Sequence, residues 1–210
     1  MTTQETVVNA ARFAQGMSWE NYVEYIGSEE NLKRPGPRGE RPNNTERYQR
    51  NIDEYQMKPE HEAALKALPT MKLLVIGEDW CPDVFRGMPV LARIAEAAGW
   101  EARFFQRDQN NDIMDEFLNV QNGQAFQSIP VAVVYTEDMT YVGHFIERPV
   151  TANEYRASVA DQFKQRDGET QEDVTKRMRK FYGELQNTDE WDRWRHATVD
   201  EIIEIAKKAG

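Results

Sequence analysis

The sequence predicts an α/β fold in which a mixed β-sheet is flanked by helices, with additional helices at both ends of the chain. Two observations lead to this prediction. Short apolar runs alternate with longer stretches whose apolar residues recur every three or four positions. The segments follow the order strand, helix, strand, helix and β-hairpin, which is typical of a mixed sheet with helices on both of its faces.

The central segment joins a strand to a helix. Leu73 to Ile76 form a short apolar run that ends at Gly77, and this predicts a buried strand. A helix is expected to begin directly behind Cys81, because apolar residues recur there on one helical face. Pro82 suits the first turn of that helix, where a missing N–H costs nothing.

The later segments complete the sheet. We expect three more strands, at residues 101–106, 129–135 and 141–146. Between the first two, Asp112 is expected to cap a helix that keeps Val120 on its inner side and ends before Gly123. Residues 151–163 are predicted to form the closing helix.

Both ends of the chain have helical patterns. Residues 4–27 are expected to be helical, with Ser18 capping a second segment and with one apolar face at Val7, Ala10, Ala11 and Ala14. From Asp167 onward the chain is charged and amphipathic. We therefore expect three regions: an N-terminal helical extension (1–68), a central domain (69–165) and a C-terminal helical extension (166–210).

The composition limits the classes of partner and compartment. The 210 residues carry a net charge of −10, which argues against nonspecific binding to nucleic acid. No apolar run approaches the roughly 20 residues that span a bilayer, and the N-terminus lacks the features of a secretory signal. A single cysteine permits no internal disulfide and fits a reducing compartment. We expect a cytoplasmic protein without membrane or nucleic-acid partners.

One loop, residues 31–44, is rich in proline and glycine and is also basic. Its cations are Lys33, Arg34, Arg38 and Arg41, in an otherwise acidic chain. The loop could bind an anionic partner or ligand. It could instead be a linker whose charges pair with the acidic surface of the protein, and we favour this second interpretation.

Cys81 is the candidate nucleophile. It lies where a strand leads into a helix N-terminus, and the free N–H groups and helix dipole there favour a thiolate. We therefore expect its pKa to lie below the free value of about 8.5, although Asp79 and Asp83 oppose this. The alternative is an inert buried cysteine. The polar residues directly before Cys81 favour exposure.

Two short motifs resemble those of a known family. Trp80-Cys81-Pro82-Asp83-Val84 resembles the W-C-x-x-C motif of thioredoxin-like proteins, and Ser128-Ile129-Pro130 resembles their cis-proline loop. The phrases EDWCPDV, GMPVLARIAEAAG, FFQRDQN, SIPVAVVYTEDM and HFIERP are similar to a branch of small bacterial thioredoxin-family proteins with an N-terminal helical segment. The resemblance covers roughly residues 69–150 and implies a thioredoxin-like fold for the central domain.

The resemblance also implies roles for individual residues. Cys81 would be the nucleophile, Trp80 would border it, and Pro130 would be cis and pack against it. Ile129 would offer backbone groups to a bound peptide. The implied substrate-binding groove consists of Trp80, Pro82, Asp83, Val84, Ile129 and Pro130.

Val84 is the main departure from the family pattern, because it stands where the second cysteine would be. Without that thiol a mixed disulfide cannot be released internally. The favoured function is a monothiol oxidoreductase that acts on protein disulfides or low-molecular-weight thiol adducts, with an external thiol resolving the intermediate. The alternatives are a non-catalytic binding module and a redox sensor, in which Cys81 is oxidised or joins two chains as a homodimer.

Other chemistries find no support in the sequence. One cysteine and three scattered histidines, His61, His144 and His196, supply no metal-ligand spacing. The sequence contains no P-loop, no GxGxxG and no GxSxG motif. We therefore expect neither a metal nor a cofactor.

Overall fold

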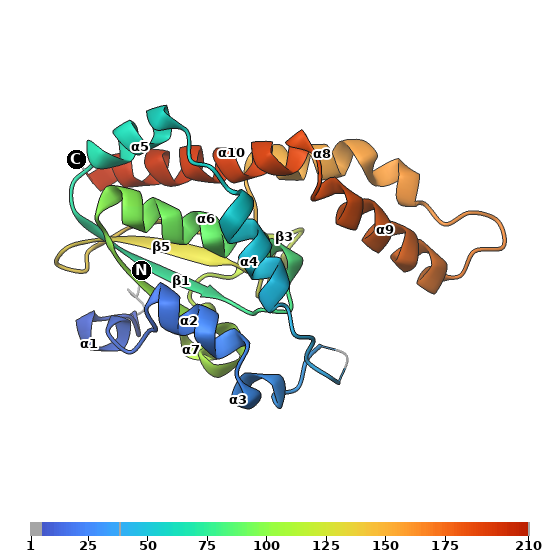
Figure 1. Ribbon diagram of the computed structural model, residues 1–210, viewed down its shortest axis with the longest axis horizontal. Helices are drawn as coiled ribbons and strands as arrows, with labels where there is room; N and C mark the ends of the chain where they lie inside the picture. The colour runs from blue at the N-terminus through green and yellow to red at the C-terminus, as the bar shows by residue number, and fades with distance from the viewer. Residues whose placement is uncertain (1–5, 38, 210) are drawn as a thin grey trace.

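The computed structural model describes residues 6–37 and 39–209, and a four-stranded sheet lies at its centre (Figure 1). The strands are β1 (Met71–Gly77), β2 (Glu101–Gln106), β5 (Val131–Thr136) and β6 (Tyr141–Ile146), in the spatial order β2-β1-β5-β6. β1 runs parallel to β2 and antiparallel to β5, and β5 and β6 form an antiparallel pair. The predicted mixed sheet is therefore confirmed.

Helix α6 (Pro82–Ala98) follows β1 and packs closely on it. A Cβ atom placed on Gly77 would lie 2.9 Å from Cγ1 of Val84, so only glycine allows this approach of strand and helix. The helix ends at Gly99, whose φ of 68° is the left-handed conformation that glycine adopts without a steric penalty. Strand and helix thus meet at a corner that carries Cys81.

Helices cover both faces of the sheet (Figure 1). α6, α5 (Pro59–Lys66) and α10 (Asp189–Ala206) lie on one face, and α1 (Ala10–Phe13), α2 (Trp19–Ile26) and α7 (Asn111–Met114) lie on the other. α10 adds Val199, Ile202 and Ile203 to the main hydrophobic core. The C-terminal helix is therefore an integral part of the packed body.

The remaining helices connect these layers or extend from them. They are α3 (Glu29–Leu32), α4 (Thr45–Glu54), α8 (Val150–Val159) and α9 (Gln171–Leu185), with 3-10 turns η1 (Arg107–Gln109), η2 (Ala160–Phe163) and η3 (Lys207–Ala209). α8 and α9 project from the body as an arm (Figure 1). A small separate cluster that includes Trp191 and Trp194 packs at the base of this arm.

The predicted helix behind Asp112 is wrong beyond its first turn. α7 ends at Met114, and a β-hairpin of β3 (Asn119–Gln121) and β4 (Gln124–Phe126) follows. Asn122 and Gly123 form its turn with φ values of 51° and 76°, as an Asn-Gly hairpin turn requires. Val120 is 69% exposed instead of facing inward.

The N-terminal helix prediction was also partly wrong. Ser18 caps α2 as expected, but Met17 interrupts the helical run by pairing with Phe104 of β2. The buried residues are Val8 and Phe13, whereas Val7 is 40% exposed and the predicted alanine face is exposed too. The pairing with the sheet edge overrides the local helical preference. The first two positions of the predicted segment, 4 and 5, lie outside the described residues.

None of the helices in the described part of the chain is both long and apolar enough to cross a membrane.

Gly143 of β6 provides a test of the packing of α10 on the sheet. A Cβ at this position would lie 2.8 Å from Cγ2 of Ile205, so Gly143→Ala forces helix and strand apart. We expect it to lower the free energy of unfolding by about 1–3 kcal/mol, measured by urea denaturation. The control is Gly183→Ala in α9, where nothing lies near the added atom and the gain in helix propensity is about 1 kcal/mol. Equal stability of Gly143→Ala and wild type would contradict this close contact.

Candidate functional site

Cys81 lies at the N-terminus of α6 with its side chain partly buried. Its N–H donates to the carbonyl of Glu78 (3.1 Å), and its carbonyl accepts from the N–H of Val84 (3.0 Å). These bonds form the turn that leads from β1 into the helix. The sulfur is therefore held at the corner that the sequence predicts.

The cis-proline loop meets this sulfur. The Ile129–Pro130 peptide is cis, as the family resemblance implied, and Cys81 Sγ lies 3.8 Å from the carbonyl oxygen of Ile129. α6 also supports the loop at Gly87, because a Cβ there would lie 3.2 Å from Cγ of Pro130. Residues about fifty positions apart in the sequence thus share one site.

The other expected groove residues differ in accessibility. Pro82 is exposed, whereas Trp80 and Asp83 are half-buried. Ile129 and Pro130 are buried, so they can offer mainly their backbone groups. Val84 is completely buried in the core. The side chain that replaces the second cysteine therefore packs against β1 and is not available at the surface.

Two charged residues in the turn after β6, Glu147 and Arg148, join the site, although no local pattern in the sequence predicts a role for them. The N–H of Glu147 donates to the carbonyl of Pro130 (2.7 Å). Arg148 donates to Asp83 Oδ2 (2.9 Å) and also bonds Glu147. The phrase HFIERP contains both residues, but it lies far from Cys81 in the sequence, and nothing in the sequence indicates that the two segments meet.

The expected low pKa of Cys81 is wrong. Burial raises the pKa of the thiol above its ordinary value, to about 12. The negative charges of Asp83 and Glu147 raise it further, whereas the N–H groups of Val84 and Asp83 lower it. The helix N-terminus therefore acts in the expected direction, but desolvation outweighs it.

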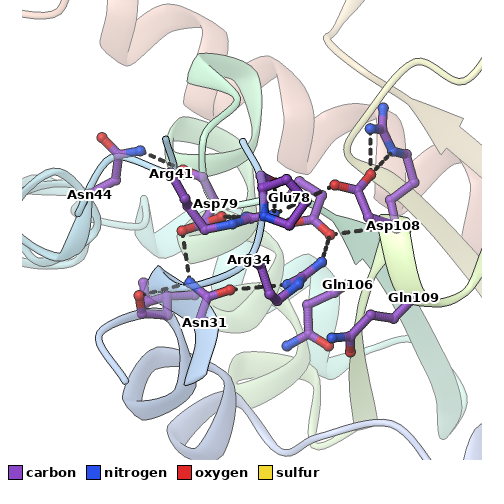
Figure 2. A network of polar contacts seen from close by, with 12 residues as sticks. Asn31, Arg34, Arg41, Asn44, Glu78, Asp79, Gln106, Asp108 and Gln109 are labelled. Carbon is purple, nitrogen blue, oxygen red and sulfur yellow. Dashed lines mark hydrogen bonds and ion pairs between the residues drawn. The ribbon is translucent and has the colours of Figure 1, made fainter. Parts of the chain in front are cut away.

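The polar residues before Trp80, Glu78 and Asp79, are buried, although we expected them to favour exposure. Glu78 and Asp79 are 0% and 2% exposed, and Arg41 lies between them (Figure 2). Nη1 of Arg41 donates to Glu78 Oε2 (2.7 Å) and to Asp79 Oδ1. Nη2 of Arg34 donates to the other oxygen of Glu78, Oε1 (2.7 Å).

Amide groups complete this buried ion cluster (Figure 2). Asn31 Nδ2 donates to Asp79 Oδ2 (3.0 Å), and Asn44 Nδ2 donates to the backbone carbonyl of Asp79 (3.1 Å). The backbone N–H of Asp108 donates to Glu78 Oε1 (3.0 Å). The 31–44 loop and the turn at Asp108 therefore hold the two residues that lead into Trp80 and Cys81.

The basic loop thus pairs its charges with acidic groups of the same chain, but not in the way we expected. The main partners of Arg34 and Arg41 are the buried carboxylates Glu78 and Asp79 beside Cys81, and Arg41 makes a longer contact with the exposed Asp108 (3.5 Å). Lys33 forms an exposed pair with Glu29 (2.5 Å). Arg38 lies outside the described residues.

Comparisons with known proteins agree with this geometry. A family model described as "Thioredoxin" matches residues 38–166, which is more than half of the chain. The chain belongs to this thioredoxin family. The match begins within the basic loop, so it includes Arg41 as well as the strand-to-helix corner.

Two solved structures share the thioredoxin-family fold of this chain at low sequence identity. A protein of unknown function from Pseudomonas aeruginosa has a TM-score of 0.64 and 14% identity, covering 97% of this chain and 99% of its own. An HIV epitope scaffold has a TM-score of 0.58 and 17% identity, covering 97% of this chain and 100% of its own. No curated protein sequence matches.

The thioredoxin-family chain shows no metal site in the part that the structure describes, because its His, Cys, Asp and Glu side chains form no group of three or more that could hold an ion.

Replacing Arg41 tests the buried ion cluster. Arg41→Met leaves Glu78 and Asp79 buried without their shared cation, so we expect a loss of about 3–5 kcal/mol in the free energy of unfolding. Urea denaturation followed by circular dichroism measures this loss. Lys33→Met is the matched control, because it removes an exposed pair from the same loop and should leave stability unchanged. A fully stable Arg41→Met would contradict the role of the cluster.

Replacing Asp83 tests the electrostatics of the thiol. Asp83 is the charge that raises the pKa of Cys81 most, so Asp83→Asn lowers this pKa and increases the thiolate fraction. We expect iodoacetamide to alkylate Cys81 several-fold faster near neutral pH. Because Cys81 is the only cysteine, the incorporated label reports this site alone. Asp138→Asn, in the turn between β5 and β6, should not change the rate.

Proposed function

We propose that this thioredoxin-family protein is a monothiol thiol–disulfide oxidoreductase in which Cys81 forms mixed disulfides that an external thiol resolves. The observation that carries the proposal is the 3.8 Å contact between Cys81 Sγ and the carbonyl of Ile129, beside cis-Pro130. The contact supports the proposal because an extended substrate paired with these backbone groups would lie next to the Cys81 sulfur.

The proposed reaction has two exchange steps. The Cys81 thiolate attacks one sulfur of a substrate disulfide, a new S–S bond forms, and the other substrate sulfur leaves as a thiolate that takes a proton from water. An external thiolate, such as that of glutathione, then attacks the substrate-derived sulfur. Cys81 leaves as a thiolate and is reprotonated. For a protein–glutathione adduct, the products are the protein thiol and glutathione disulfide.

The external thiol is required because Val84 offers no second sulfur. The raised pKa of Cys81 makes the proposed reaction depend on pH, because little thiolate exists near neutral pH. Below the thiol pKa, the rate should rise about tenfold for each pH unit. The proposed activity is therefore slow at neutral pH and accelerates in alkaline solution.

A binding module without catalysis is the second candidate. The buried Val84 and the raised pKa of Cys81 favour it, because turnover needs a resolving thiol and a thiolate nucleophile. Such a protein would hold a partner in the same groove through Trp80, Pro82 and the Ile129 carbonyl. Turnover distinguishes the two functions, because a binding module forms no product.

The test uses glutathione disulfide and intact-protein mass spectrometry. At about pH 9 we expect one glutathione to attach to the wild-type protein, and added glutathione to remove it. Catalysis is then measured as the reduction of hydroxyethyl disulfide by glutathione, coupled to glutathione reductase. Cys81→Ser should lose both the adduct and the activity. A folded wild-type protein that matches Cys81→Ser in both assays would rule out the oxidoreductase and leave the binding module.

A further inference from the structure

Arg86, in the second turn of α6, is a buried cation with few partners. Its side chain is fully buried, and Nη2 makes two long contacts of 3.4 Å, with Asp83 Oδ1 and the carbonyl of Glu147. Its Nε and Nη1 groups have no hydrogen-bond partner among the described residues. Buried guanidinium groups are normally paired and fully hydrogen-bonded, so this arrangement leaves charge and donors available.

The C-terminal helix holds this cation in position. The guanidinium carbon of Arg86 lies 5.5 Å from the ring centre of Trp191 and 5.8 Å from that of Trp194. Both tryptophans are buried on α10, and Nε1 of Trp194 donates to Glu190 (2.8 Å). The aromatic rings stabilise the cation but accept none of its unpaired N–H groups in a strong hydrogen bond. Arg86 is therefore fixed without being neutralised.

The charge of Arg86 can act on the thiol of Cys81. Asp83 contacts Arg86 and is also the charge that acts most strongly on the Cys81 thiol, so the three groups share one electrostatic site. Burial lowers the pKa of Arg86, whereas the negative charges of Asp83 and of a Cys81 thiolate act in the opposite direction, so thiolate and guanidinium attract each other. The attraction is effective because burial excludes the water that would screen it.

Arg148 is a second cation that interacts with a charged Cys81, but it already pairs with two carboxylates. Its Nη2 atom bonds the carboxylates of both Asp83 and Glu147. Arg86 makes only one long contact with a carboxylate. Nε of Arg148 also lacks a partner among the described residues, but Arg86 has two such groups, so Arg86 has the larger free capacity to stabilise a new negative charge.

We infer that Arg86 is the counter-ion that stabilises the Cys81 thiolate, and that Trp191 and Trp194 hold it in place. The inference rests on the proposed function only in that this function uses the thiolate. The stabilisation by Arg86 is greatest when Cys81 carries a negative charge. This is the case at the start of the attack on a disulfide and when Cys81 leaves the mixed disulfide. It also gives the C-terminal helix a role at the reactive site.

The test measures the alkylation of Cys81 by iodoacetamide as a function of pH. Arg86→Met removes the charge but keeps an apolar side chain against the tryptophans, so the pKa of Cys81 should rise. A rise of one unit lowers the thiolate fraction tenfold, and the greater nucleophilicity of the more basic thiolate offsets part of this. We therefore expect Arg86→Met to react about threefold or more slowly at about pH 8, and Arg86→Lys to recover most of the wild-type rate.

Arg195→Met is the matched control. Arg195 is also buried at the N-terminal half of α10, and its Nε also lacks a partner among the described residues. Its partners are Asn51 (2.7 Å), Glu54 and Asp192, and these residues do not belong to the site around Cys81. Its replacement should perturb helix packing but leave the rate of alkylation unchanged.

The outcomes separate a counter-ion from a packing residue. A folded Arg86→Met that reacts at the wild-type rate or faster overturns the inference, as does an equal slowing in Arg195→Met. If Arg86→Met does not fold, the alkylation rates of Arg86→Gln and Arg86→Lys provide the same comparison between an uncharged and a charged side chain. Alkylation needs no disulfide turnover, so a missing glutathione reaction would overturn the proposed function without affecting this result.

Discussion

The buried cluster of Arg41, Glu78 and Asp79 is the interaction on which the geometry of the site depends. Two carboxylates that lead directly into the reactive corner are fully buried, and a single guanidinium bridges them. Burial at this position is costly for each charge taken alone and is tolerated only because the partners are hydrogen-bonded on several sides. The N-terminal loop that supplies the arginines is therefore part of the site.

The charges on the other side of Cys81 determine its chemistry. Desolvation and the carboxylates of Asp83 and Glu147 favour the thiol, whereas the helix N-terminus favours the thiolate. A dipole at a helix end contributes about 0.3–2 kcal/mol, which is less than the effect of removing the sulfur from water. A cysteine at a helix start is therefore not necessarily acidic. By our inference, Arg86 is the cation that returns part of this balance toward the thiolate.

Much of the fold could be predicted because local patterns follow from burial. The strand before Gly77, the helix behind Cys81 and the hairpin of β5 and β6 all have the periodicity that a packed core imposes. The errors have physical causes as well. Gly123 on its own predicts the end of a helix, whereas the pair Asn122-Gly123 forms the turn of a hairpin. Around Met17 a bridge to β2 overrode the local preference for helix.

The sequence by itself determined the α/β order, the position of Cys81 at a strand-to-helix corner, and the absence of a second thiol at Val84. It could not determine the charge environment of that sulfur. Arg41, Arg86, Glu147 and Arg148 come from separate segments, and their effect depends on distance and burial, which have no local signature. Only the tertiary structure decided that burial raises the pKa of the thiol and that Arg86 lies beside Asp83 with unpaired donor groups.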